Sequence, residues 1–123
     1  MNYDDFVIRV QDRLDVSQEQ ALKIIEACLE TLGERLYRTE REKFAAQLPA
    51  QLKKFILKRI DNDRYNLEEF YKRVGARAGM RQGRGAETAQ AVMAVVREAI
   101  TPGELEYLGS HLPDEYEELW MEK

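Results

Sequence analysis

The sequence consists of one pattern that occurs twice, with the second copy 64 residues after the first. When residues 1–59 are laid on residues 65–123 without a gap, roughly a fifth of the pairs are identical, which is typical of an internal repeat. Apolar character is kept at further pairs: Tyr3/Leu67, Cys28/Val92, Leu29/Met93, Leu32/Val96, Leu36/Ile100, Phe44/Leu108, Leu52/Tyr116 and Phe55/Leu119. A shared register of apolar positions predicts a shared core, so each half is expected to be one copy of one supersecondary unit.

The length of the chain favours packing of the two halves against each other. The chain has 123 residues, of which 44% are hydrophobic and 34% charged. A separate unit of about 60 residues would bury only about 60% of the surface of its unfolded chain and would be marginally stable. We therefore predict one compact domain, in which residues 1–60 form the first repeat, residues 61–64 a short polar connector and residues 65–123 the second repeat.

Every stretch of the chain has the pattern of a helix. No run of β-branched residues alternates with a period of two, and apolar residues recur at spacings of three and four. Capping-box spacings begin at Asn2, Ser17, Thr39, Asn66 and Thr101. The sequence predicts an all-α fold of two four-helix repeats, related by an approximate twofold axis and packed through their long second helices. The expected helices cover residues 2–14, 17–36, 39–47 and 50–60, and then 66–77, 85–100, 102–111 and 114–121.

The sequence contains no recognisable catalytic or metal-binding pattern. The single Cys28 excludes an intramolecular disulfide and a cysteine cluster, and its equivalence to Val92 in the second repeat indicates a core residue. The single His111 is equivalent to Gln47 and is expected to be a partly exposed residue at a helix end, although a histidine can act as a general base. We expect no catalytic residue, no metal and no cofactor, and hence a protein that is not an enzyme.

Three glutamates share one helix face at four-residue spacing. They are Glu26, Glu30 and Glu34 in the long helix of the first repeat. Di-iron bundles combine such glutamates with a Glu-x-x-His motif, which this sequence lacks. We therefore expect the three side chains to be solvated.

The clearest difference between the repeats is a basic, glycine-rich loop at residues 79–85, where the first repeat has a compact capped turn. Arg73 and Arg77 precede this loop on one helix face, and Arg81 and Arg84 lie within it. The loop leads into a helix N-terminus, where free N–H groups favour anions. The four arginines are candidate contacts to a nucleic acid or another anionic ligand, and the plainer interpretation is a flexible loop with solvated arginines.

A second basic cluster closes the first repeat, and its equivalent in the second repeat is mostly acidic. The basic residues Lys53, Lys54, Lys58 and Arg59 are equivalent to Glu117, Glu118, Glu122 and Lys123. Such opposed charges favour docking between halves or between molecules, although two solvated helix faces are the plainer interpretation. Lys53, Lys54 and Lys58 are thus candidate contacts to a protein partner. Trp120 is another candidate, although its equivalence to Ile56 indicates a core residue.

The net charge and the first residues limit the partners and the location of the protein. A net charge of −4 gives no overall preference for nucleic acid, although local patches can bind it. The chain opens with acidic residues where a signal peptide carries basic ones, and no long apolar run follows. We expect a cytoplasmic protein without a membrane-spanning segment, present as a monomer or a homodimer.

Five segments carry a family resemblance: MNYDDFVIRV at 1–10, LETLGERL at 29–36, AAQLPAQLKKF at 45–55, NLEEFYKRV at 66–74 and AVMAVVREAITPGELEYLGSHLPDEYEELW at 91–120. Through them the chain resembles a mostly prokaryotic family catalogued as domain of unknown function 2267. The Leu-Pro turns at 48–49 and 112–113 and the two Asn-x-x-x-Phe starts are the most specific parts. The resemblance implies a small, duplicated, all-helical protein, and it implies no established activity, catalytic residue or cofactor.

These observations predict a non-enzymatic protein that presents helix faces and charged loops to a protein partner. The alternative is a nucleic-acid or anionic-ligand binder that uses the loop at 79–85 together with Arg73 and Arg77. The two classes differ in their dependence on salt, because phosphate contacts weaken steeply as ionic strength rises.

Overall fold

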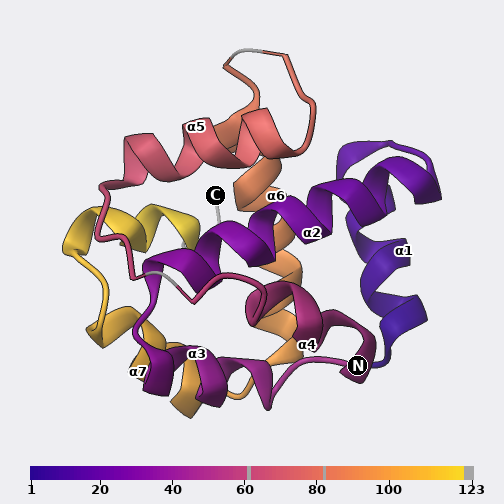
Figure 1. Cartoon of the computed structure of the whole chain (residues 1–123). Coiled ribbons are helices and arrows are strands. Elements are labelled where there is room, and N and C mark those ends of the chain that lie inside the picture. Colours follow the sequence, from indigo (N-terminus) through magenta and orange to yellow (C-terminus); the bar gives the residue numbers. More distant parts are fainter. Residues whose placement is uncertain (61, 82, 121–123) are drawn as a thin grey trace.

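The computed structural model describes residues 1–60, 62–81 and 83–120, and its regular elements in these ranges are all helical (Figure 1). The predicted all-α fold class is confirmed. The elements in chain order are α1 (Tyr3–Leu14), α2 (Gln18–Arg35), α3 (Arg38–Ala45), α4 (Ala50–Ile56), α5 (Leu67–Arg77), α6 (Gly85–Ala99), α7 (Pro102–Ser110) and the 3₁₀ helix η1 (Asp114–Leu119). Asp61 of the predicted connector, Gln82 of the basic loop and residues 121–123 of the predicted second repeat lie outside the described residues.

Side-chain caps begin several helices at the residues that the sequence predicts. The side-chain oxygens of Asn2, Ser17, Asn66 and Thr101 each accept a hydrogen bond from the backbone N–H three residues later. Such N–H groups have no partner within the helix, so each cap stabilises the first turn. The starts of α1, α2, α5 and α7 are thus determined by local sequence.

The start of α3 differs from the prediction. The sequence predicts a cap at Thr39, whereas α3 begins at Arg38 and Tyr37 is the residue before it. The Glu40 carboxylate accepts a hydrogen bond from the Tyr37 N–H at 3.1 Å. This bond closes the first turn two residues before the predicted cap, so Thr39 lies inside the helix.

The fourth helix of the first half is shorter than predicted. It ends at Ile56, whereas the sequence predicts a helix over 50–60. Lys58 and Arg59 fold back toward carboxylates of α2 instead of continuing the helix. The prediction failed because these ion pairs join positions that are distant in the sequence.

The last predicted helix, over 114–121, is the 3₁₀ helix η1 in the described residues. Its i to i+3 bonding begins with a hydrogen bond from the Tyr116 N–H to the Pro113 carbonyl at 2.9 Å. With three residues per turn, this helix brings Tyr116 and Leu119 to one side, and both are buried.

Helix α2 crosses the middle of the molecule and packs against α1, α4, α5 and α6 (Figure 1). Helix α6 packs in turn against α1, α5 and η1, and α3 lies against α4 and α7. The buried apolar side chains form one cluster that includes Leu29 and Leu32 of α2 and Val92 and Val96 of α6. A core shared by both halves gives each half the burial that it would lack alone.

Gly33 allows α2 to approach the end of α4 closely, and its replacement tests this packing. A Cβ at Gly33 would overlap the carbonyl oxygen of Ile56. Alanine is favoured over glycine in helices by about 1 kcal/mol, yet we expect Gly33→Ala to lower the free energy of unfolding by about 1–3 kcal/mol, because overpacking outweighs that preference. Urea unfolding followed by circular dichroism measures the difference.

Gly109 in α7 provides the matched control, because a Cβ there meets no atom within 4 Å. We expect Gly109→Ala to leave the free energy of unfolding unchanged or to raise it slightly. A Gly33→Ala protein as stable as the wild type would contradict the close approach of α2 and α4.

Candidate functional site

Two glutamates of α2 are buried, so the prediction that the glutamate ladder is solvated is wrong for them. Glu30 and Glu34 are only 5% and 6% exposed, whereas the Glu26 side chain is 43% exposed. The physical reason is that residues 57–60, residues 62–65 and α5 lie on this side of α2 and bring cationic side chains to it. A carboxylate in such a place is stable only when it is paired and hydrogen-bonded.

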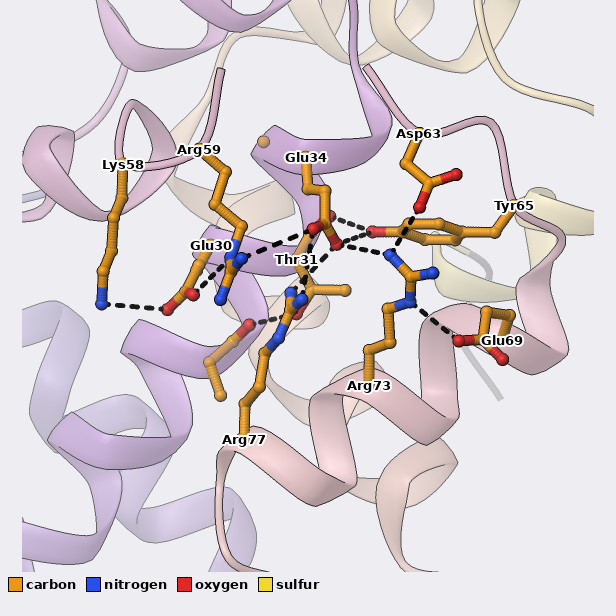
Figure 2. A network of polar contacts seen from close by, with 12 residues as sticks. Glu30, Thr31, Glu34, Lys58, Arg59, Asp63, Tyr65, Glu69, Arg73 and Arg77 are labelled. Atoms are coloured by element: carbon orange, nitrogen blue, oxygen red, sulfur yellow. Dashed lines mark hydrogen bonds and ion pairs between the residues drawn. The ribbon is translucent and has the colours of Figure 1, made fainter. Parts of the chain in front are cut away.

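Arginines from two other segments surround these carboxylates (Figure 2). Arg59 Nε lies 2.6 Å from Glu30 Oε1. Arg73 and Arg77 of α5 both reach Glu34 Oε1, at 2.9 and 3.1 Å. We name the buried glutamates and the cations around them the α2 ion-pair network, which consists of Glu30, Glu34, Lys58, Arg59, Arg73 and Arg77.

The network changes the titration of its central carboxyl. Burial raises the pKa of Glu34, but the hydrogen bonds from Arg77, Arg73 and Tyr65 and the charge of Arg77 together lower it by more, so the pKa lies below its ordinary value. The hydrogen bond to Glu69 is the largest of the contributions that raise the pKa of Arg73. Both partners therefore stay charged around neutral pH.

Tyr65 fixes the segment between the two halves onto the network. Its hydroxyl lies 2.5 Å from the Thr31 carbonyl oxygen and 3.1 Å from Glu34 Oε1, and donates to these acceptors. The Arg73 guanidinium stacks over its ring at 4.2 Å. Burial, followed by the charge of Glu34, raises the pKa of Tyr65, so the hydroxyl keeps its proton. The backbone is held as well, because the Asp63 N–H donates to the Glu34 carbonyl at 3.0 Å.

The four arginines predicted to contact an anion lie in two different places. Arg73 and Arg77 point toward α2 and pair with Glu34 (Figure 2). Arg84 pairs with a glutamate of α6 at 3.1 Å. Arg81 is exposed and lines a hollow of about 260 Å³ beside the start of α6. The structure thus brings Arg73 and Arg77 together at α2 and leaves the other two at the loop.

The residues predicted to contact a protein partner are also divided. Lys58 belongs to the network and faces α2, not the acidic side chains of η1. Lys53 is half-buried and Lys54 is exposed on α4. Trp120 is half-buried against the core, and its carbonyl accepts a hydrogen bond from a guanidinium of α6 at 2.6 Å. Residues 122–123 of the predicted acidic counterpart lie outside the described residues.

The neighbours of Lys58 and Arg59 in the chain form an apolar groove that the sequence analysis missed. Lys58 and Arg59 turn inward to α2, whereas Leu57 and Ile60 are 42% and 83% exposed. Together with α3 these two apolar residues bound a groove of about 400 Å³. We name it the Ile60 groove, and its lining consists of Arg38, Arg41, Glu42, Leu57 and Ile60.

Arginines hold the wall and the edge of the Ile60 groove. Arg41 is buried and donates from Nε to the Gly33 carbonyl and from Nη2 to the Leu36 carbonyl, both at 2.8 Å. These bonds satisfy carbonyl groups at the C-terminus of α2. Beside the groove, the exposed Tyr37 carries the Arg64 guanidinium over its ring at 4.1 Å. The groove therefore places apolar side chains next to guanidinium groups, and the hydrogen bonds of Arg41 hold one of these groups in position.

Cys28 and His111 lie in different surroundings, one in the core and the other at the surface. Cys28 is fully buried, as predicted, and burial raises the pKa of its thiol, so a reactive thiolate does not form. His111 is exposed, with Nδ1 2.7 Å from the Tyr107 carbonyl and Nε2 3.9 Å from the Glu40 carboxylate. The Ser110 hydroxyl lies 3.2 Å from Nδ1 but donates to the same carbonyl at 2.7 Å, so it is not activated by the histidine.

Within the ranges 1–60, 62–81 and 83–120, no group of three or more His, Cys, Asp or Glu side chains is placed to hold a metal ion. None of the helices in this part of the chain combines the length and the apolar character that crossing a lipid bilayer requires.

Comparison with protein families gives a match over most of the chain. The family model described as "Uncharacterized conserved protein (DUF2267)" matches residues 3–119. No curated protein matches the sequence.

Replacement of Glu34 tests the role of the α2 ion-pair network. Glu34→Gln keeps the shape of the side chain and removes the charge that faces Arg73 and Arg77, whose side chains are 25% and 22% exposed. We expect the free energy of unfolding to fall by about 3 kcal/mol, the low end of the range for a broken buried ion pair, because both arginines retain some contact with water. In the control Glu42→Gln, which removes an exposed pair with Arg38, it should change by less than about 0.5 kcal/mol. Similar losses in both variants would contradict the special role of Glu34.

The same variant gives a pH dependence. The pKa of Glu34 is lower in the folded than in the unfolded state, so its contribution to stability is present above the ordinary glutamate pKa of about 4.3 and is lost as the pH falls through the lower folded-state pKa. The difference in unfolding free energy between wild type and Glu34→Gln should be constant near neutral pH and shrink in acid. Urea titrations at several pH values measure it, and a difference that persists in strong acid would exclude the charge as its cause.

Proposed function

Because the chain belongs to the family described as Uncharacterized conserved protein (DUF2267), whose description names no activity, we propose a function from the surface of the molecule. The protein is a non-enzymatic helical module that binds a protein partner through the Ile60 groove. The observation that carries this proposal is the 83% exposure of Ile60 next to the exposed Leu57 in a groove of about 400 Å³. Exposed apolar side chains gathered in one place are typical of interaction sites.

The scaffold of the groove supports the proposal. Leu57 and Ile60 flank Lys58 and Arg59, whose charges are held by carboxylates of α2. These ion pairs hold the two residues between Leu57 and Ile60 against α2. A surface that is already in its binding conformation loses less conformational entropy when a partner docks. Arginine, which lines this groove, is enriched at protein interfaces.

We also propose that the module consists of two four-helix repeats, residues 1–60 and 65–123, related by an offset of 64 residues and an approximate twofold axis. The helix starts support this proposal, because α1 and α5, α3 and α7, and α4 and η1 begin at 3 and 67, 38 and 102, and 50 and 114. The helix contacts support it too. In this repeat α1 corresponds to α5 and α2 to α6. The contact of α2 with α5 therefore corresponds to the contact of α6 with α1, and both contacts are present.

Two ion clusters give further support to the repeat. In one cluster two arginines of α5 pair with a glutamate of α2, and in the other two arginines of α1 pair with a glutamate of α6. The distances range from 2.9 to 3.8 Å. The clusters are Arg73 and Arg77 with Glu34, and Arg9 and Arg13 with Glu98. Corresponding members are 64 positions apart in the sequence. On this proposal the charges at these positions serve the fold in both copies, not a ligand in one.

Retention of a protein from a lysate of the source organism tests the proposed function. The immobilised wild type is compared with Ile60→Ser and with Ile8→Ser, a control that replaces a 52% exposed isoleucine of α1. We expect a foreign protein to be retained by the wild type and by Ile8→Ser, and to be lost with Ile60→Ser, because only the last variant removes the apolar edge of the groove. Mass spectrometry identifies the protein, and titration of the purified partner with the three variants checks direct binding.

Two outcomes of this experiment would contradict the proposal. Equal retention by all three variants would exclude the groove as the binding surface. Retention of no foreign protein by the wild type would exclude the interaction function under the conditions of the lysate. Circular dichroism of each variant separates loss of binding from loss of folding.

A nucleic-acid or anionic-ligand binder is the alternative function. The observation that favours it is the hollow beside the start of α6, which is lined by Lys72 and Arg81. Arg84, the residue before α6, gives no side-chain cap to the first N–H groups of this helix. Basic side chains beside uncapped N–H groups favour an anion.

The alternative is tested with oligonucleotides at increasing salt. If it holds, log affinity falls by roughly 0.9 per log unit of salt for each duplex phosphate contacted. The double variant Arg81→Ala, Arg84→Ala should then bind more weakly, and a control in which Arg38 is replaced by Ala should bind as the wild type does. Absence of binding by the wild type at low salt, measured by fluorescence anisotropy, would exclude this alternative.

A further inference from the structure

The exposed large apolar side chains of the described residues fall into two sets. Leu57 and Ile60 line the Ile60 groove, and Tyr37 lies beside it at the start of α3. Met1 and Ile8 belong to the N-terminal segment and α1. A small protein that exposes two separate apolar sites can bury both of them in contacts with neighbouring copies, if one site is complementary to the other.

The second set lies among carboxylates. Asp4 and Asp12 lie one helical turn before and after Ile8, and Asp5 lies three residues before it, so all three share its side of α1. These aspartates are exposed. The arginines of α1 nearby pair with a glutamate of α6, so the aspartates dominate the charge around Ile8. We name this surface the Ile8 face, and it consists of Asp4, Asp5, Ile8 and Asp12.

The Ile60 groove carries the opposite charge. Arg38 and Arg41 line it, and Arg64 lies over Tyr37 beside it. Among the described residues of the lining Glu42 is the one acid, and it pairs with Arg38 at 3.0 Å, so the guanidinium groups are in excess. The Ile8 face thus presents an apolar side chain among carboxylates, and the Ile60 groove presents apolar side chains among guanidinium groups. Arginine binds carboxylates through paired hydrogen bonds, and opposed potentials direct two surfaces toward each other.

We infer that the Ile8 face of one copy of the chain docks into the Ile60 groove of a second copy. The inference rests on the proposed function of the groove as a protein-binding site, and it names a second copy as a partner. The two surfaces belong to different parts of the molecule, with α1 at one side of Figure 1 and the start of α3 toward the other. Each molecule therefore offers both surfaces at once, and association continues head to tail into rings or open chains.

The acidic helix η1 of a second copy fits the groove less well. Its apolar residues Tyr116 and Leu119 are buried in its own core. Its Glu115 carboxylate already accepts a hydrogen bond from the Leu67 N–H at 2.7 Å. This helix would bring charge without an apolar side chain, whereas the Ile8 face brings both.

Sedimentation velocity of the purified full chain over a wide range of concentration tests the inference. We expect the weight-average sedimentation coefficient to rise with protein concentration and to fall when salt is added, because salt screens the charges at the edge of the contact. A wild-type protein that stays monomeric up to about millimolar concentration, where the free energy of association is weaker than about −4 kcal/mol, overturns the inference. That outcome would not exclude binding of a foreign protein through the Ile60 groove. Failure of the self-association inference can therefore be distinguished from failure of the proposed function.

Two variants show whether the contact is head to tail. Ile8→Ser removes the Ile8 face and keeps the groove, and Ile60→Ser does the reverse. Each variant alone should self-associate at least about tenfold more weakly than the wild type, because loss of a central apolar contact removes more than about 1.4 kcal/mol. An equal mixture should form a one-to-one dimer that grows no further, because the Ile8 face of one variant fills the groove of the other. Variants that stay monomeric on mixing, or one variant that associates as the wild type does, overturn the inference.

A pair of charge variants tests the complementarity. Asp4→Asn with Asp12→Asn should weaken self-association about three- to tenfold, the effect of losing two partly exposed ion pairs. Glu19→Gln with Glu106→Gln is the matched control, since it removes the same charge from exposed positions outside both surfaces. Equal effects of the two double variants would show that net charge alone is responsible, and would overturn the complementarity on which the inference rests.

Discussion

The buried carboxylate of Glu34 is the constraint on which the rest of the structure depends. The residue is only 6% exposed, and a carboxylate in such a place is stable only among cations and hydrogen-bond donors, which here are Arg73, Arg77 and Tyr65 (Figure 2). Glu34 belongs to α2, the two arginines to α5 and the tyrosine to the segment between the halves. The docking of α5 and the position of Tyr65 therefore depend on the same charge.

The same requirement shapes the outer surface of the molecule. Lys58 and Arg59 must reach the carboxylates of α2, so the chain after α4 cannot bury its apolar residues on that side. Leu57 and Ile60 then face the solvent and form the edge of the groove. The pairing of the buried α2 glutamates thus leads to exposed apolar side chains at the Ile60 groove. The α2 glutamates and the groove are therefore coupled through the segment that carries Leu57, Lys58, Arg59 and Ile60.

The helices were predictable from the sequence because their determinants are local. The caps at Asn2 and Asn66 involve residues three positions apart, and apolar spacing gives each buried face. The ion-pair network was not predictable in this way, because Glu34 and Arg73 are 39 positions apart and a glutamate at helical spacing looks the same whether buried or solvated. A signal was nevertheless present, since five charges are identical at positions 64 residues apart, and Arg9/Arg73, Arg13/Arg77 and Glu34/Glu98 are three of these pairs. The groove left no such signal, because an apolar residue after a helix resembles a core residue.

The enclosed position of Cys28 has a practical consequence. It is the single cysteine of the chain, and its thiol lies fully buried in the core that both halves share. A thiol reagent dissolved in water reaches this sulfur only after the surrounding helices separate. The speed of its chemical modification therefore records how often the interior opens, in the natural protein and without any introduced label.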